Sequence, residues 1–226
     1  MKCDLHMHST YSFDSIMSPR NIVRCCSLRN LSLISVTDHD TMEIYQNEFS
    51  TERRTEILET HGTRIIPGME VNTDRGDIIG LFLDSEITAR EFSNVISQIR
   101  AQDGLVLLPH PYYRNGDPRE LIPDIDIIEV VNGRCKSDLN DRAANLAEEC
   151  CLPTIGGSDA HIYWEIGHIH THFDDTSGTL RQEELTKELL IDSERDIRGS
   201  PLPFYMTHGV SYASGRLKRL LGRSIR

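Results

Sequence analysis

Short apolar runs alternate with longer amphipathic stretches along most of the chain. The apolar runs have the length and composition of buried strands and lie at residues 31–36, 78–83, 105–108, 125–131 and 152–155. The amphipathic stretches, which carry apolar positions at helical spacing, include residues 18–28, 88–99 and 137–150. Strand and helix repeated in this way predict parallel strands joined by right-handed crossovers.

Local signals predict where several of these elements begin or turn. Ser18 followed by Pro19 predicts a capped start for the first helix. Thr88 with Glu91 has the pattern of a capping box, and Gly76 predicts a hairpin turn. Further elements are expected at residues 41–60 (one helix), 166–173 (a strand) and 180–190 (a helix).

Polar side chains recur where the predicted strands end. These residues are His6, His8, His39, Glu70, His110, Arg134, Asp159 and His161. In a closed barrel of parallel strands the carboxyl ends gather on one face, so side chains far apart in the sequence meet there.

His6 and His8 lie two residues apart, so an extended backbone points both imidazoles to the same side. Two such imidazoles are a ready pair of ligands for a divalent metal. An isolated pair is often a coincidence, and each other fragment could be a helix cap or a solvated turn. Their coincidence at one predicted rim favours a metal centre. Nitrogen and oxygen ligands without cysteine suit Zn²⁺, Mn²⁺ or Fe²⁺.

Composition narrows the classes of function. The chain has 226 residues, and its formal net charge of −11 argues against binding to long nucleic acid, because that affinity depends on Lys and Arg. A small phosphorylated substrate is compatible, since bound metal ions reverse the sign of the charge locally. No stretch reaches the ~20 apolar residues of a transmembrane helix, and no signal-peptide pattern is present. Six cysteines without a CxxC motif predict reduced thiols, so we expect a cytoplasmic protein.

Taken in order, the fragments HxH, Asp14, TDHD, GxE, HP and GSDAH resemble the PHP family, named for its polymerase and histidinol phosphatase members. The resemblance covers roughly residues 3–170. It implies an α/β fold, a distorted (β/α)7 barrel of the TIM-like type. It also implies a cluster of two or three divalent metal ions that hydrolyses phosphate esters. We expect one PHP domain over residues 1–206, with a basic helix or tail at 207–226 packed on it.

The resemblance also implies a ligand set. A first metal would be held by His6, His8, Glu70 and Asp159. Glu70 would bridge to a second metal that His110 also holds, and a third would be held by Asp14, His39 and His161.

One position departs from the family pattern. The strand after GxE often supplies a histidine three residues before a glycine, and here Asp77 stands at that place before Gly80. Asp77 is therefore a possible ligand, and the second site would be weaker or would prefer a harder ion such as Mn²⁺. His168, His170 and His172 form an alternating strip beyond the family motifs, and we interpret them as a solvated strand face.

The proposed mechanism follows from charge. Metal ions lower the pKa of a bridging water, and the resulting hydroxide attacks phosphorus in line. Arg134 could donate two hydrogen bonds to the phosphoryl group, or could be a surface arginine after a turn. Asp38 or Asp40 could orient a ligand histidine, and Asp40 could instead protonate the leaving group.

We therefore expect a single-domain metal-dependent phosphoesterase that acts on a phosphate monoester of a small metabolite or nucleotide. A nuclease acting on the ends of short nucleic acids is the nearest alternative. A scaffold that binds metal without turnover is a second one. A Rossmann-type nucleotide-binding protein is disfavoured, because no GxGxxG follows the first strand. The oligomeric state is left open.

The substitutions His8→Ala and Asp159→Ala are predicted to abolish hydrolysis of phosphate esters without unfolding the chain, because each removes a predicted ligand and no apolar core. Activity assays alongside circular dichroism of the purified variants check this. Normal turnover by both variants would show that the predicted site is wrong.

Overall fold

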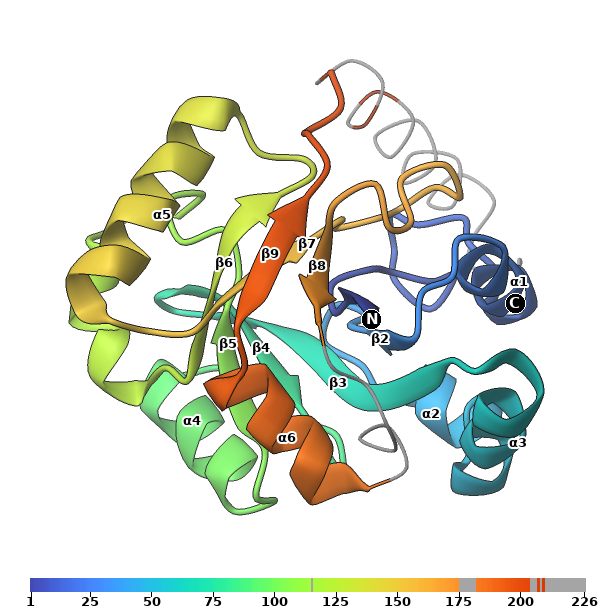
Figure 1. Ribbon diagram of the computed structural model, residues 1–226. Helices are drawn as coiled ribbons and strands as arrows, with labels where there is room; N and C mark the ends of the chain where they lie inside the picture. Colours follow the sequence, from blue (N-terminus) through green and yellow to red (C-terminus); the bar gives the residue numbers. More distant parts are fainter. Residues whose placement is uncertain (115, 175–181, 204–206, 208, 210–226) are drawn as a thin grey trace.

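A single strongly bent sheet forms the centre of the molecule. The computed structural model describes residues 1–114, 116–174 and 182–203, together with Thr207 and Gly209. Its nine-stranded sheet has the order β7-β6-β5-β4-β3-β2-β1-β8-β9. The sheet curves until β7 and β8 come into contact, and the amide of Gly156 donates to Oγ1 of Thr171 across this junction at 2.9 Å (Figure 1). The predicted α/β class and TIM-like barrel are confirmed.

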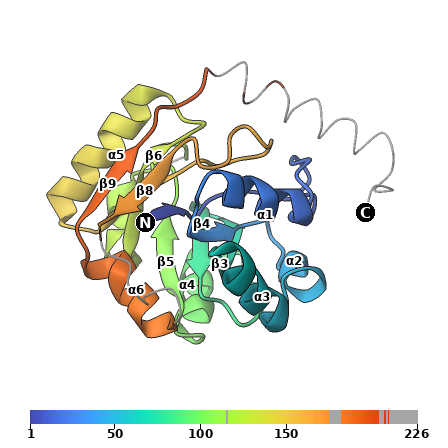
Figure 2. The ribbon, with the colours of Figure 1, turned by 45° about the vertical axis from the view of Figure 1, so that its right-hand side comes forward.

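The strands and helices have these bounds. The strands are β1 (Lys2–Asp4), β2 (Leu33–Val36), β3 (Arg64–Thr73), β4 (Gly76–Leu81), β5 (Leu105–Leu108), β6 (Ile127–Asn132), β7 (Thr154–Gly157), β8 (His170–Phe173) and β9 (Arg195–Arg198). The helices are α1 (Pro19–Leu28), α2 (Glu43–Asn47), α3 (Thr51–His61), α4 (Phe92–Arg100), α5 (Ser137–Cys150) and α6 (Glu183–Asp192), with the short 3₁₀ turns η1 (Pro118–Glu120) and η2 (Ile122–Asp124). Figures 1 and 2 show the helices arranged around the outside of the sheet.

The regular alternation of strand and helix holds for only part of the chain. The pairs β1–β2, β2–β3, β5–β6 and β6–β7 are parallel, as predicted. However, β3 turns directly into the antiparallel β4, with Gly76 opposite Thr73, so the predicted hairpin is confirmed. Strand β8 pairs antiparallel with both β1 and β9, and β9 was not predicted because its sequence contains one apolar residue, Ile197. The strand expected at 166–173 is shorter than predicted, because β8 begins only at His170.

Two predicted helix features are wrong. The helix expected at residues 41–60 is interrupted before Ser50, whose hydroxyl accepts from the Arg53 amide and caps α3. The capping box of Thr88 and Glu91 does not form. Instead Asp74, from the β3–β4 hairpin, accepts the amide of Phe92 at 2.8 Å and caps α4 through a tertiary contact.

Two hydrophobic clusters lie on opposite faces of the sheet. The larger cluster packs the sheet against the surrounding helices. The smaller one draws one or two residues from most strands and fills the inside of the barrel, where Leu189 and Leu190 of α6 join it. None of the described helices has the length and apolar character that crossing a membrane requires. The basic segment predicted at 207–226 lies outside the described residues, apart from Thr207 and Gly209.

Truncation of Leu107, which is 0% exposed inside the barrel, is expected to lower the free energy of unfolding by about 2–5 kcal/mol as Leu107→Ala, because it leaves a cavity. The control Leu28→Ala removes the same atoms from a side chain that is 74% exposed on α1, and a change within about 0.5 kcal/mol is expected. Urea denaturation of both variants measures the difference. Equal losses would contradict a packed barrel interior.

Candidate metal centre

Eight predicted site residues form one cluster on the face where β1, β2, β5 and β7 end. They are His6, His8, Asp14, His39, Glu70, His110, Asp159 and His161, linked to one another by contacts of 2.9–3.6 Å. Seven lie in the segments that follow a strand. Glu70 differs from the prediction because it lies in the interior of β3, which continues to Thr73.

His6 and His8 point to the same two carboxylates, as their spacing predicts. The Nε2 of His8 is 3.3 Å from Oε2 of Glu70 and 3.3 Å from Oδ1 of Asp159. The corresponding distances from Nε2 of His6 are 3.5 and 3.6 Å. Strand β1 ends at Asp4, but the pairing of Met7 with Ala160 keeps this segment extended beside the end of β7.

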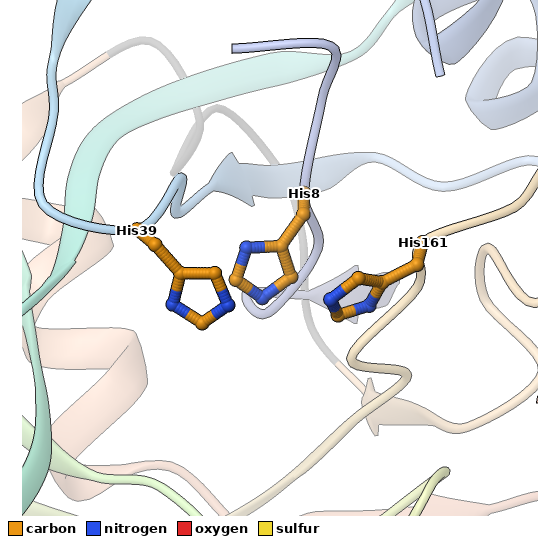
Figure 3. Close-up of side chains that lie close together, drawn as sticks. All are labelled: His8, His39 and His161. Carbon is orange, nitrogen blue, oxygen red and sulfur yellow. The ribbon is translucent and has the colours of Figure 1, made fainter. Parts of the chain in front are cut away.

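A row of three imidazoles forms the other half of the cluster. His8 lies between His39 and His161, with ring centroids 4.3 Å from each (Figure 3). The Oδ2 of Asp14 is 2.9 Å from Nε2 of His161 and 3.6 Å from Nε2 of His39. Donor atoms of the three histidines all lie within 4.8 Å of one another.

Glu70 connects the two halves. Its Oε2 is 3.1 Å from Nδ1 of His39, in addition to its contacts with His6 and His8. Its other oxygen, Oε1, is 3.1 Å from Nε2 of His110. The side chain is 1% exposed, so the carboxylate is almost completely withdrawn from water.

The backbone is unusual at three positions of this face. Asp40, His110 and Asp159 have φ of +55°, +29° and +50°, in the left-handed region that non-glycine residues seldom adopt. Such conformations persist where surrounding contacts enforce them, and they are frequent at functional sites.

A second layer of polar residues holds the imidazoles in place. The Nδ1 of His8 donates to Oγ of Ser12 at 3.2 Å, and Ser12 in turn donates to Asp38 at 2.8 Å. The amide of His39 also donates to Oγ of Ser12. Asp38 therefore orients a candidate ligand, as the sequence suggests, but it does so through Ser12. These contacts leave Nε2 of His8 as its free ligand atom.

Glu129, which was not predicted from the sequence, orients the ring of His6 in the same way. Its Oε1 accepts Nδ1 of His6 at 2.9 Å, and its Oε2 accepts the amide of His110 and Nδ2 of Asn132, each at 2.9 Å. A Cβ on Gly157 would lie 2.1 Å from Oε1 of Glu129, so glycine is required beside this carboxylate. The available signal was a single acid within the apolar strand that ends at Asn132, because a buried acid needs polar partners.

The pKa values follow from burial and mutual attraction. Burial opposes the charged form of His6, but Glu129, Asp159 and Glu70 together raise its pKa well above the usual value. Burial opposes ionisation of Glu70 as well, yet His39 and His6 hold its pKa well below the usual range. Burial, reinforced by the like charges of His39 and His161, lowers the pKa of His8 to about 3. A divalent cation bound among these groups would supply the positive charge that the buried carboxylates attract.

Orphaned atoms show that the cluster fits a divalent cation. Among the described residues, Nε2 of His6, Nε2 of His8 and Oε2 of Glu70 are buried without a hydrogen-bond partner. Such atoms are rare in folded proteins unless an ion or water satisfies them. All three converge on the same space beside Asp159. Imidazole nitrogens and carboxylate oxygens in this arrangement are ligands that Zn²⁺, Mn²⁺ and Fe²⁺ accept.

Asp77 is not brought into the cluster. Its carboxylate accepts Nδ2 of Asn72 at 2.7 Å, on the exposed part of the hairpin. It belongs to none of the potential ligand groups among the described residues, and neither do His168, His170 and His172.

Arg134 and Asp40 lie beside the cluster and have other partners. The side chain of Arg134 is 8% exposed and pairs with Glu165 at 3.1 Å, so its interpretation as a surface arginine is wrong. Glu165 also accepts the amide of His161, which connects Arg134 to the segment that carries two candidate ligands. Asp40 lies at the rim, where it accepts the amide of Asn72 and pairs with Arg90 at 3.3 Å.

A nearly closed α/β barrel that gathers carboxylates and imidazoles at its strand ends has the arrangement in which barrel enzymes place their active sites. Comparison with known proteins identifies the family. The PHP domain model matches residues 4–141, and a second model, described as PHP-associated, matches residues 138–190. The chain belongs to the PHP family.

Individual relatives agree with this assignment. The chain is 30% identical over 202 residues to the uncharacterized protein MJ0417 of Methanocaldococcus jannaschii, covering 84% of this chain and 78% of that one. A two-domain protein of Bacteroides vulgatus, described as "containing predicted PHP-like metal-dependent phosphoesterase", is similar in structure with a TM-score of 0.68 and 22% identity. The match covers 88% of this chain and 65% of that longer protein. PsfC from Pseudomonas syringae gives a TM-score of 0.68 at 17% identity, covering 97% and 98% of the two chains.

Replacing Glu129 by glutamine is expected to weaken Mn²⁺ binding by about 10–100-fold, because His6 loses the charged acceptor that fixes its orientation. The control Glu149→Gln removes an exposed carboxylate that pairs with Arg119 outside the cluster, and it should leave the affinity unchanged. Isothermal titration calorimetry with Mn²⁺ measures both. Wild-type affinity in Glu129→Gln would show that Glu129 does not position His6.

Proposed function

We propose that this protein is a metal-dependent phosphoesterase that hydrolyses a phosphate monoester of a small metabolite or nucleotide. The observation that carries this proposal is the convergence of orphaned, buried imidazole and carboxylate atoms at the strand-end face. The cluster is open to solvent on one side, since Asp14 and His39 are 19% and 23% exposed. Family membership supports the reaction class, and the name of the Bacteroides vulgatus protein describes the same class.

Two or three divalent ions would be held by the clustered residues. His6, His8, Glu70 and Asp159 would hold one, and Asp14, His39 and His161 would hold another, with His110 beside Glu70. When bound, such ions polarise phosphoryl oxygens and make water a stronger nucleophile near neutral pH. Zn²⁺, Mn²⁺ and Fe²⁺ are the candidates.

The residues around the ions have separate tasks. Glu129 and Ser12 fix the rings of His6 and His8, which keeps the ligand atoms aimed before substrate arrives. Arg134 acts through Glu165, which holds the segment that carries Asp159 and His161. Asp40 remains the proposed contact for the leaving group, because it is the half-exposed carboxylate at the rim.

Two exposed aromatic rings flank the cluster and suggest where the organic part of the substrate binds. Phe13 is 59% exposed and stacks on His39, with ring centroids 5.3 Å apart. Tyr113 is also 59% exposed and meets His110 edge-on at 6.0 Å. Exposed rings beside a phosphate site can stack on a planar group of the substrate. They also make a nuclease acting on the ends of short nucleic acids the second candidate function.

Cysteine chemistry supports a reducing compartment. All six cysteines are free, including the adjacent pairs Cys25–Cys26 and Cys150–Cys151. We therefore propose a cytoplasmic location.

Protein stripped of metal and reconstituted with Mn²⁺, Zn²⁺ or Fe²⁺ is expected to release inorganic phosphate from an aryl phosphate and from small phosphate monoesters. Chelation or the substitution His39→Ala should remove at least about 90% of this activity. The control His61→Ala changes an exposed histidine on α3 and should have no effect.

A 5′-phosphorylated oligonucleotide in the same assay separates the two candidate enzymes. Cleavage of the oligonucleotide without turnover of monoesters would favour the nuclease. Metal binding without turnover of either substrate would contradict the proposal and favour a non-catalytic scaffold.

A further inference from the structure

We infer that this chain completes two ion sites rather than three, and that the guanidinium of Arg114 supplies the fixed positive charge beside His110. The inference rests on the proposed metal centre, but it does not depend on which reaction that centre performs.

The histidines at the centre of the cluster each have one free ligand atom. The Nδ1 of His6 is occupied by Glu129, that of His8 by Ser12, and that of His161 by the carbonyl of Asp159 at 2.8 Å. Only Nε2 of each ring is therefore available. One nitrogen lone pair binds one ion, so the three potential ligand groups, which share His6 and His8, cannot all be filled at once.

Assigning each atom once gives two complete sites. One site takes Nε2 of His6, Nε2 of His8, Oε2 of Glu70 and Oδ1 of Asp159, whose four nitrogen–oxygen distances of 3.3–3.6 Å suit a shared ion. The other takes Asp14, His39 and His161. Catalytic sites of this kind ordinarily have three or more protein ligands.

Too few ligands remain for a third ion. Beside Glu70, the atoms left facing each other are Nε2 of His110 and Oε1 of Glu70, which already contact each other at 3.1 Å. The position that would supply the next ligand is Asp77, and its carboxylate is engaged with Asn72. In the β3–β4 register Glu70 pairs with Ile79, whereas Asp77 pairs with the exposed Asn72, two residues closer to the turn.

Arg114 places a positive charge on this side of the cluster. Its Nη2 donates to the carbonyls of Asp77 at 2.8 Å and Pro109 at 3.0 Å. Its Nη1 donates to Arg75 and its Nε to Pro111, both at 3.1 Å. The guanidinium therefore donates its hydrogen bonds to backbone carbonyl oxygens. No carboxylate of the described residues lies within ion-pair distance of it. This leaves its charge to act on the cluster through space.

The turn between β3 and β4 leaves room for the Arg114 side chain. Gly76 has φ of +102°, and a Cβ there would lie 2.8 Å from Nη1 of Arg114. Burial lowers the pKa of Arg114 to about 10, against the attraction of Asp77 and Glu70, so the side chain remains a cation at neutral pH. The bonds to Pro109 and Pro111 also hold both sides of His110 in its strained conformation. Arg114 is thus a positioning residue that also carries charge.

The ion count tests the first half of the inference. Metal-free protein is equilibrated with Mn²⁺, freed of excess ion, and analysed by native mass spectrometry and elemental analysis. Mn²⁺ is the probe because Zn²⁺ binds imidazoles more readily and could also bind outside the centre, at the partly exposed His168, His170 and His172. We expect two ions in the wild type, two in His110→Ala and one in His39→Ala. Three ions in the wild type, or loss of an ion in His110→Ala, would overturn the inference.

Phosphate binding tests the second half. With both ions bound, Arg114→Gln is expected to weaken binding of inorganic phosphate by about fivefold, because a nearby positive charge is lost. The control Arg119→Gln removes an exposed arginine paired with Glu149 and Asp117, and it should change nothing. Unchanged phosphate binding in Arg114→Gln would overturn the role assigned to Arg114. Neither measurement uses a substrate, so failure of the proposed reaction would be seen separately.

Discussion

The structure depends on one buried negative charge, the carboxylate of Glu70, which positive charge and hydrogen bonds from other segments must compensate. Glu70 lies in the interior of β3 with 1% exposure and has imidazoles from three different segments within 3.5 Å of its two oxygens. Burying an ionised carboxylate is costly unless opposite charge and hydrogen bonds compensate. Burial opposes ionisation of Glu70, but His39 and His6 hold its pKa well below the usual range, and a divalent cation would supply more positive charge at a shorter distance.

The barrel makes this concentration of charge possible because its apolar clusters hold the strands, while the polar side chains lie mostly in the segments after the strands. The apolar interior and the helix-facing cluster fix the strands, while the segments after β1, β2, β5 and β7 carry the polar side chains. A second layer then fixes the rings. Glu129 serves His6 and the amide of His110, and Ser12 with Asp38 serves His8 and the amide of His39. Removal of one second-layer group therefore disturbs two candidate ligands at once.

Much of this could be predicted from the sequence, for identifiable reasons. Apolar periodicity reports which faces are buried, so the α/β class and most strands were evident. The histidine and carboxylate fragments follow predicted strands, which indicated that they lie on one face of the barrel. The structure brings eight of those residues together. The hairpin at Gly76 was predicted, but the position of Glu70 in the interior of β3 was not. Apolar periodicity does not show at which residue a strand ends, so Glu70 was placed at the end of β3 when the strand continues to Thr73.

The features that could not be predicted from the sequence all depend on contacts between segments that are distant along the chain. Asp74 replaces the predicted capping box because a hairpin side chain reaches the start of α4. Glu129 finds its partners 123 and 19 positions away, and Arg114 reaches back to the carbonyl of Asp77 across 37 positions. The departure of Asp77 from the family pattern was visible in the sequence. The contact of Arg114 with the carbonyl of Asp77 could not be predicted from it. The partner of a polar side chain is decided by the tertiary structure.

The central claim is that the orphaned atoms around Glu70 are ligands of a metal ion. The most direct test is anomalous diffraction at the manganese edge from crystals of the wild-type protein grown with Mn²⁺. A strong anomalous peak is expected at coordination distance, about 2.0–2.3 Å, from Nε2 of His6, Nε2 of His8 and Oε2 of Glu70. Absence of a peak there, at an ion concentration that loads the protein in solution, would contradict it.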